Sequence, residues 1–257
     1  MSVSTRAAVV SEVGGGFKID TVELEDPRPG EVIVRLVATG LCHTDLNIAE
    51  GNIPFEFPAV LGHEGAGIVE KVGADVRQVE VGDRVLLSFT SCGRCDQCRQ
   101  GHPALCQHHL PWNLLSGRRP DGTTGISHHG MKVSGHFFGQ SSFGERALVS
   151  ERSIVRIGAD VSDEEMALYA PLGCGLQTGA GAILNVLRPG PGESVVIAGA
   201  GAVGLAAVMA SVITAARQIV VLDRVPKRLE LARELGATDV IDTSQVDPAE
   251  EIGRAHV

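Results

Sequence analysis

The stretch that decides the fold is Gly192–Asp223, GESVVIAGAGAVGLAAVMASVITAARQIVVLD. It opens with an apolar run, Ser194–Ala198, and continues with a G-x-G-x-x-G pattern at Gly199–Gly204. Small and apolar residues fill Leu205–Ala216, and a second apolar run follows at Gln218–Leu222. This order predicts a buried strand, a tight turn, a helix and a second strand, which are the parts of a parallel α/β sheet.

The glycine pattern also predicts a phosphate-binding turn. Gly199 and Gly201 would let a pyrophosphate approach backbone N–H groups at the helix N-terminus, and Gly204 completes the pattern. Asp223 follows about 20 positions later, where an acidic side chain binds the ribose hydroxyls of a dinucleotide. A carboxylate there repels a 2′-phosphate, so we expect NAD rather than NADP, although Arg224 beside it offers an opposing charge.

Composition excludes several classes of protein. Ser194–Ala216 carries no charge and could be taken for a membrane span, but the glycines interrupt it where a turn is expected. The net charge is −9 and basic residues are not clustered, which argues against nucleic acid as a partner. Met1–Arg6 lacks an apolar signal core, so we expect a cytoplasmic location.

Around this stretch, the chain of 257 residues predicts two domains. Downstream, a helix is expected over Pro226–Gly236 and a third strand over Asp239–Asp242. Upstream, short strands such as Phe17–Val22 and Val32–Ala38 alternate with glycine turns, which is typical of a small β-barrel. One helix is expected to begin after Ser162, where Glu165 three residues on would complete a capping box, and a second helix is expected to begin at Pro171. We place the domain boundary at Pro171, giving residues 1–170 and 171–257.

Six cysteines occur in two groups. Cys92, Cys95, Cys98 and Cys106 follow the spacing C-x2-C-x2-C-x7-C, which lets four thiolates close a tetrahedral shell around a structural zinc. An iron–sulfur cluster is the alternative, but the bacterial ferredoxin pattern has its last cysteine closer and followed by proline. Unpaired buried thiols are a third possibility. A disulfide framework does not suit a chain of this length without an export signal.

The other two cysteines can join a histidine in a second metal site. Cys42, His63 and Cys174 together make a Cys2His set that leaves one position open, as a catalytic zinc requires. Glycines frame His63 in Gly62–Gly67, so the backbone can pass close to whatever the imidazole binds. Thr44 and Asp45 follow Cys42 directly and can be interpreted in two ways: as residues that start a helix, or as a proton acceptor and a support for the metal ligand.

The segment Gln107–Gln140 is rich in glycine, histidine and serine, and we expect a long excursion over the mouth of the active site. Five histidines lie in it, and none has a paired ligand spacing, so we expect solvated loop residues rather than metal ligands: His108, His109, His128, His129 and His136.

Together these motifs resemble the zinc-dependent medium-chain alcohol dehydrogenase family over nearly the whole chain. The excursion, which ends in FFGQSSF at Phe137–Phe143, is most similar to bacterial aryl-alcohol (benzyl alcohol) dehydrogenases. The resemblance implies a GroES-like catalytic domain followed by a Rossmann domain. It also implies NAD-dependent oxidation of a primary, aromatic alcohol, or of another alcohol, a polyol or a formaldehyde adduct.

The resemblance implies roles for individual residues. Cys2His is the ligand set described for the catalytic zinc of alcohol dehydrogenases, and Cys42, His63 and Cys174 match it. Thr44 matches the hydroxyl that takes the alcohol proton, Asp45 the carboxylate that orients the zinc histidine, and Glu64 a group behind the ion that aids ligand exchange. Four further positions match coenzyme contacts: His43 at the phosphate, Thr178 behind the nicotinamide, and Asp223 and Arg228 at the adenosine ribose.

The sequence departs from the family in two places. Asn47 stands where some members carry a histidine that continues the proton relay. The coenzyme domain should have six parallel strands, but the sequence predicts three, so we expect a C-terminally truncated chain whose full-length form is a homo-oligomer. Ile252–Val257 can be encoded by the start of a sequencing adapter, which suggests a tail of non-native origin; a natural terminus of unusual composition is the alternative. The alternative for such a chain is a zinc-binding fragment without turnover.

Overall fold

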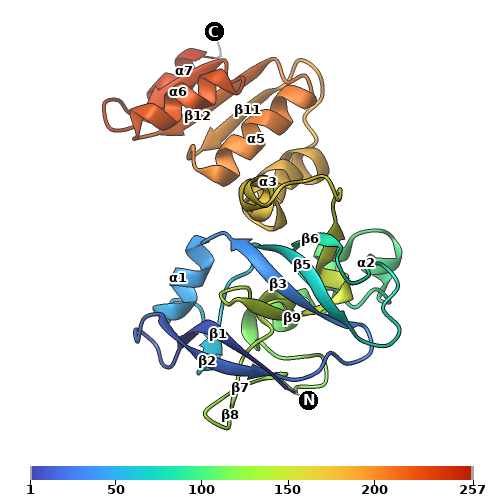
Figure 1. Cartoon of the computed structure of the whole chain (residues 1–257). Helices are drawn as coiled ribbons and strands as arrows, with labels where there is room; N and C mark the ends of the chain where they lie inside the picture. Colours follow the sequence, from blue (N-terminus) through green and yellow to red (C-terminus); the bar gives the residue numbers. More distant parts are fainter. Residues whose placement is uncertain (1, 256–257) are drawn as a thin grey trace. The chain divides into compact units, whose positions relative to one another are not determined.

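The computed structural model describes residues 2–255, with side chains described through Ile252 (Figure 1). The chain divides into two compact units, Met1–Cys174 and Gly175–Val257, so the division falls slightly later than the boundary expected after residue 170. The last two residues of the suspected non-native tail, 256 and 257, lie outside the described residues.

The first unit contains two antiparallel sheets. The first has the strand order β4-β1-β2-β7-β8, and the second β10-β6-β5-β3-β9. The strands are β1 (Val3–Val10), β2 (Lys18–Leu24), β3 (Glu31–Thr39), β4 (Ala59–Val60), β5 (Gly65–Val72), β6 (Arg84–Leu87), β7 (Ile126–His128), β8 (Met131–Val133), β9 (Arg146–Ser150) and β10 (Ile154–Arg156). This arrangement of short strands confirms the β-rich first domain.

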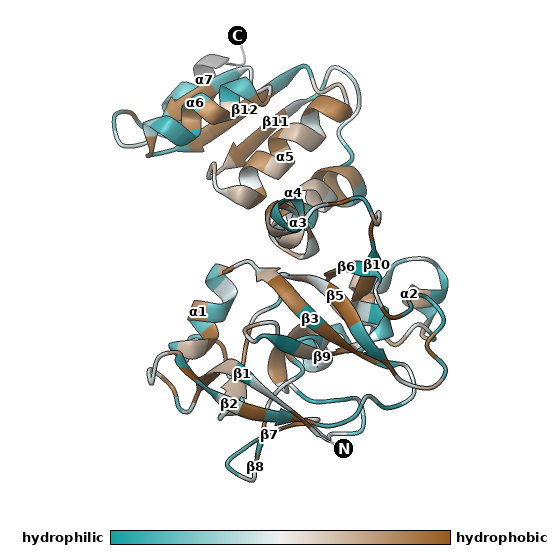
Figure 2. Cartoon of the chain, in the orientation of Figure 1, coloured by the Kyte–Doolittle hydropathy of each residue, from teal (hydrophilic) through white to brown (hydrophobic). Residues whose placement is uncertain are grey.

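Each sheet buries its apolar side chains in its own core. Val32 and Val34 of β3 pack with Val69 of β5 in one cluster, and Val9 of β1 packs with Val22 of β2 in another. Figure 2 shows the hydrophobic residues gathered along β3 and β5. Alternation of buried and exposed positions along β1 is the pattern of a strand with one solvated face.

Short helices connect these strands. They are α1 (His43–Ala49), α2 (Asp96–Arg99), η1 (Pro103–Leu105), η2 (Pro111–Leu115), η3 (Phe137–Gly139), η4 (Glu151–Ser153), α3 (Asp163–Tyr169) and η5 (Ala170–Gly173). Ser162 caps α3 by accepting a hydrogen bond from the backbone N–H of Glu165 at 3.2 Å, and the Glu165 carboxylate accepts one from Ser162 N at 2.8 Å. The capping box expected from the sequence is therefore present.

The second unit is a parallel sheet with helices. Its strands β11 (Ser194–Ala198), β12 (Gln218–Asp223) and β13 (Asp239–Asp242) pair in that order, and its helices are α4 (Gly175–Gly181), η6 (Ala182–Leu187), α5 (Ala202–Ile213), α6 (Pro226–Glu234) and α7 (Pro248–Ala255). The strand–turn–helix interpretation of Ser194–Ala216 is confirmed. Among residues 2–255, no helix has the length and apolarity that a membrane span requires.

Two local predictions were wrong. The helix expected from Pro171 is instead a single 3-10 turn, η5, and α4 begins only at Gly175. A Cβ on Gly173 would lie 1.9 Å from the carbonyl oxygen of Leu87, so η5 packs closely on the end of β6. The helical backbone is interrupted at Cys174, whose φ of −141° and ψ of −83° are not helical. The excursion Gln107–Gln140 is also more regular than expected, because β7 and β8 form a hairpin that extends the first sheet beside β2.

Candidate active site and structural metal centre

Three segments far apart in sequence converge on one point of the first unit. Cys42 is the N-cap residue of α1, His63 lies just before β5, and Cys174 follows η5. One ligand atom from each of Cys42, His63, Glu64 and Cys174 lies within 4.8 Å of all the others. The two cysteines and the histidine of the expected catalytic set are therefore brought together, and Glu64 is added to them.

Asp45 fixes the orientation of the His63 imidazole. Its Oδ1 lies 3.2 Å from His63 Nδ1 and accepts a hydrogen bond from Gly62 N at 2.9 Å, while its Oδ2 accepts one from Cys42 N at 3.1 Å. The Asp45 carboxylate is wholly buried. The two interpretations of Asp45 are therefore compatible, since the same carboxylate completes the capping box of α1 and supports the candidate ligand.

The opposite ring nitrogen of His63 has the surroundings of a metal ligand. His63 is 1% exposed, and within the described residues its Nε2 has no hydrogen-bond partner. Buried polar atoms are normally satisfied, so an unpartnered imidazole nitrogen facing two cysteine sulfurs calls for a cation. Imidazole and thiolate are the donors that zinc prefers, and Cys42, His63 and Cys174 therefore fit a zinc ion whose fourth position lies within reach of Glu64 and can also take an exchangeable ligand.

The charges at this site are arranged for a thiolate. The neighbouring Cys174 thiol and then the His63 imidazole lower the pKa of Cys42 to about 3. Burial alone would lower the pKa of His63, but the Asp45 carboxylate and then the nearby Cys42 sulfur raise it to about 9. The pKa of Cys174 is raised, first by its hydrogen bond to Cys42 and then by burial. Without metal, this cluster holds protons that a cation would displace.

Thr44 and Glu64 lie beside the candidate ligands. Thr44 Oγ1 is 3.5 Å from Cys42 Sγ, and Thr44 is half-buried. Glu64 is buried, and a Cβ on Gly40 would lie 2.0 Å from Glu64 Oε2, so Gly40 leaves room for this carboxylate. Asn47, in contrast, faces the loop after α1, where its Oδ1 accepts a hydrogen bond from Asn52 Nδ2 at 3.3 Å.

Sequence reasoning missed the residues that hold His63 from its other sides. Gln140 is wholly buried; its Nε2 donates to the carbonyls of His63 (2.9 Å) and Ser88 (3.0 Å), and its Oε1 accepts from Gly65 N (3.1 Å). The ring of Phe138 stacks on the imidazole at 4.5 Å between centroids, and that of Phe137 meets it edge-on at 5.2 Å. The FFGQSSF segment was noted only for its resemblance to aryl-alcohol dehydrogenases, and nothing in it predicted these contacts, because a loop glutamine is usually exposed.

The four clustered cysteines form the second centre. Their sulfur atoms all lie within 4.8 Å of one another. Backbone N–H groups donate to these sulfurs, from Cys95 to Cys92 Sγ at 3.3 Å and from His108 to Cys106 Sγ at 3.4 Å. N–H donors of Gln107 and Cys98 lower the pKa of Cys95 to about 6. A closed shell of four sulfurs fits a structural zinc and leaves no position for a substrate.

The expected phosphate-binding turn has the required backbone. Gly199 has φ +95°, and a Cβ on Gly204 would lie 1.8 Å from the Gly199 carbonyl oxygen, so neither position accepts a side chain without strain. Nothing lies within 4 Å of a Cβ on Gly201, the N-cap residue of α5. The space beside Gly201 is therefore open to a ligand at the helix N-terminus.

Asp223 is tied to this turn. Its Oδ2 accepts a hydrogen bond from Ala200 N at 2.7 Å and lies 4.0 Å from Arg228 Nη1, and its Oδ1 accepts one from Val225 N at 2.9 Å. Burial opposes ionisation, but the backbone donors of Ala200 and Val225 outweigh it and lower the pKa of Asp223. The remaining coenzyme residues are exposed: Thr178 on α4 of this unit, and His43 at the start of α1 in the first unit.

The loop histidines do not all behave as expected. His136 is buried, and its Nε2 accepts a hydrogen bond from Gly125 N at 3.1 Å. Burial lowers the pKa of His136 to about 4, so it is a neutral structural residue and the prediction of a solvated side chain was wrong. His108 stacks on Trp112 at 4.6 Å, and His128 lies 2.9 Å from Asp20.

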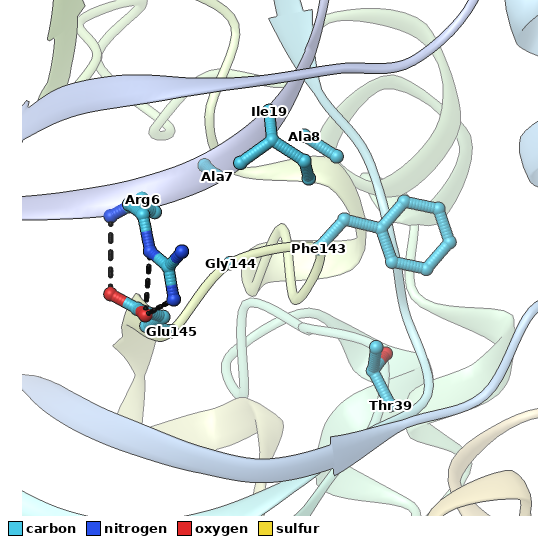
Figure 3. A pocket seen from close by; sticks show the side chains of 8 residues that line it. All are labelled: Arg6, Ala7, Ala8, Ile19, Thr39, Phe143, Gly144 and Glu145. Carbon is cyan, nitrogen blue, oxygen red and sulfur yellow. Dashed lines mark hydrogen bonds and ion pairs between the residues drawn. The ribbon is translucent and has the colours of Figure 1, made fainter.

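A separate cavity of about 410 Å³ opens between β1, β2 and the segment after η3 (Figure 3). Phe143, Ile19 and Thr39 line it, and the ion pair of Arg6 with Glu145 lies at its side. It contains none of Cys42, His63 and Cys174, so we do not assign the substrate to it.

Comparison with known proteins places these features in a family. A family model described as "Alcohol dehydrogenase GroES-like domain" matches residues 28–159, and one described as "Zinc-binding dehydrogenase" matches residues 202–256. Geraniol dehydrogenase of Castellaniella defragrans is 45% identical over 240 residues, which are 93% of this chain and 63% of that protein. S-(hydroxymethyl)glutathione dehydrogenase of Escherichia coli O1:K1 is 40% identical over 247 residues, 95% of this chain and 66% of the relative.

A solved structure of an alcohol dehydrogenase is similar to this chain in both sequence and fold. The crystal structure of benzyl alcohol dehydrogenase from Acinetobacter calcoaceticus is 43% identical and superposes with a TM-score of 0.90, covering 98% of this chain and 67% of that one. The chain thus spans less than two thirds of the length of the curated relatives described above.

Proposed function

Because the chain belongs to the zinc-dependent medium-chain alcohol dehydrogenase family, we propose that the protein oxidises a primary aromatic alcohol to its aldehyde, with NAD as the hydride acceptor. The observation that carries this proposal is the buried, unpartnered Nε2 of His63, grouped with the sulfurs of Cys42 and Cys174. A Cys2His set with an open position is suited to bind an alcohol oxygen.

In this proposal, a zinc ion held by these residues would supply a Lewis acid that lowers the pKa of the alcohol oxygen, and NAD would supply the hydride acceptor. Cys42, His63 and Cys174 hold the ion, and Asp45 keeps the His63 Nδ1 proton turned away from it. Thr44, whose hydroxyl lies 3.5 Å from Cys42 Sγ, accepts the alcohol proton. Asn47 cannot carry that proton further, so its release would run through the coenzyme ribose and water, or through another base.

The aromatic preference rests on Phe138. Its ring stacks on His63 and remains partly exposed, so it offers an apolar wall next to the open position. Aromatic rings pair favourably in offset or edge-to-face contact, by about 0.5–1.5 kcal/mol beyond the area they bury. Two relatives are named for benzyl alcohol and geraniol, which are both largely apolar primary alcohols.

The choice of NAD rests on Asp223. Its carboxylate borders the turn at Gly199–Gly204 and stays ionised, so it can accept hydrogen bonds from ribose hydroxyls and repels a 2′-phosphate. Arg228, 4.0 Å away, partly balances this charge from the side of α6.

A second candidate substrate is a formaldehyde adduct, because one relative at 40% identity is named as an S-(hydroxymethyl)glutathione dehydrogenase. An adduct of that type carries several charges, whereas Phe137 and Phe138 surround His63 with apolar surface. A further alternative for the 257-residue chain is zinc binding without turnover, since the parallel sheet has three strands within residues 2–255.

The test is NADH formation by the zinc-loaded chain with benzyl alcohol, an aliphatic alcohol of similar size, and S-hydroxymethylglutathione. We expect the highest kcat/KM for benzyl alcohol, and NAD to be preferred to NADP. Thr44→Val should lower kcat by about 10²–10⁴-fold, as expected for loss of a proton acceptor. Thr21→Val, at an exposed position of β2, is the matched control and should leave the rate unchanged.

Three results would count against the proposal. A higher kcat/KM for S-hydroxymethylglutathione than for benzyl alcohol would show that the substrate is a formaldehyde adduct. Equal activity of the Thr44→Val variant would remove Thr44 from the mechanism. Zinc uptake without any NADH formation would leave a metal-binding chain and no dehydrogenase activity.

A further inference from the structure

A third group of possible metal ligands lies outside both cysteine-containing centres. It consists of Asp20 on β2, His128 at the end of β7 and His129 in the turn before β8. One ligand atom of each lies within 4.8 Å of the other two. The strands β2, β7 and β8 are neighbours in one sheet, as Figure 1 shows, so pairing between strands brings these residues together and sequence spacing does not.

The distances within this group match those between ligands of one metal ion. Asp20 Oδ2 lies 2.9 Å from His128 Nε2 and 3.5 Å from His129 Nε2. Ligand atoms bound at about 2.0–2.1 Å and separated by angles of about 90–109° are about 2.9–3.4 Å apart. The Asp20 oxygen therefore lies at a ligand-to-ligand distance from His128 Nε2 and just beyond that range from His129 Nε2, whose exposed side chain is free to move closer.

Local structure holds these three side chains in place. The backbone N–H of Thr21 donates to Asp20 Oδ1 at 2.7 Å, which leaves Oδ2 for the two histidines. His128 and Met131 are paired across the hairpin, and the two residues between them, His129 and Gly130, have φ +49° and +77°. Asparagine or glycine usually occupies the first of these turn positions. Here the turn places the two imidazole rings 4.1 Å apart, between centroids, on the same side as Asp20.

We propose that Asp20, His128 and His129 bind a divalent transition-metal ion such as Zn²⁺ or Ni²⁺, with water in the remaining positions. Two imidazoles and one carboxylate are a donor set for such ions, whereas Mg²⁺ and Ca²⁺ prefer oxygen ligands alone. The exposed fractions of the side chains are 45%, 12% and 69%, so the ion exchanges with solvent and differs from a closed structural zinc. Bound metal would join the hairpin to β2.

The experiment uses the untagged chain with its two cysteine-containing centres already loaded with zinc. Ni²⁺ is titrated into it by calorimetry, and Mg²⁺ serves as the comparison ion. The variants are Asp20→Asn, which keeps the size of the side chain, and His129→Asn, which suits the left-handed turn. His102→Asn, at an exposed histidine outside the group, is the matched control.

We expect the wild-type chain and the His102→Asn variant to bind one further Ni²⁺ and to melt at a higher temperature when it is present. Asp20→Asn and His129→Asn should bind that ion at least about tenfold more weakly, as loss of ligands or their supports typically does. Melting curves without Ni²⁺ show whether the variants are folded. The proposal is overturned if no third ion binds, if Mg²⁺ binds equally well, or if neither substitution in folded protein changes the affinity for Ni²⁺.

Discussion

Substitution of Asp45 tests whether one buried carboxylate organises the candidate catalytic site. It is 0% exposed and accepts from three donors, Cys42 N, Gly62 N and His63 Nδ1. A buried donor left without a partner costs about 1–3 kcal/mol. Asp45→Ala leaves two such buried donors, Gly62 N and His63 Nδ1, and the partly buried Cys42 N; the buried pair alone costs about 2–6 kcal/mol, a large share of a domain's stability of about 5–15 kcal/mol.

Asp45→Asn is therefore the more informative variant. If its amide oxygen takes the place of Oδ1, the bonds from Gly62 and His63 remain and only the one from Cys42 N is lost. We expect the free energy of unfolding to fall by about 1–3 kcal/mol. Loss of the negative charge behind His63 should also weaken zinc binding at this site by about 10–100-fold.

The assay for Asp45→Asn combines chemical denaturation with competition for zinc by a chromophoric chelator. Asp160→Asn, at an exposed aspartate of the same unit, is the control and should change the unfolding free energy by less than about 0.5 kcal/mol. Our reasoning is refuted if Asp45→Asn unfolds at the wild-type denaturant concentration and binds zinc with an affinity within twofold of the wild type.

Three further predictions address the other centre, the phosphate-binding turn and pH. Cys98→Ser should lower the zinc content by one ion per chain, measured by elemental analysis after exchangeable metal has been removed; an unchanged zinc content would exclude the four-cysteine site. Gly204→Ala should lower the melting temperature of the second unit, because its Cβ would lie 1.8 Å from the Gly199 carbonyl oxygen. The Cβ of Gly201→Ala would meet nothing within 4 Å, so this variant should keep the wild-type melting temperature. It should bind NADH more weakly, as measured by fluorescence. A lower melting temperature with unchanged NADH binding would contradict the proposed pyrophosphate site. Zinc affinity should rise between about pH 6 and 9, since zinc must displace the proton of His63, whose pKa is about 9, and that of Cys174; a flat profile by calorimetry would contradict this. In the metal-free chain, the free energy of unfolding depends on pH in the opposite direction. The raised pKa of His63 stabilises the fold fully at pH values below about 6.5, its pKa in the unfolded chain, and this stabilisation is lost as the pH rises through about 9.

Where local chemistry determines local structure, the sequence alone was sufficient. The tight turn at Gly199–Gly204 depends on backbone contacts between residues that are near one another in sequence. The four clustered cysteines are likewise close enough along the chain to share one ion. The capping box at Ser162 and Glu165 is a contact within one helical turn.

Only the tertiary structure decided which distant groups meet. Gln140, Phe138 and the His128–Asp20 pair act across strands or loops, and their sequence neighbours give no sign of it. His136 appeared to be a solvated loop histidine, but packing buries it and lowers its pKa to about 4. The physical reason is that burial and the pairing of strands depend on contacts between segments remote in sequence, whereas turns, caps and short ligand spacings depend on neighbours along the chain.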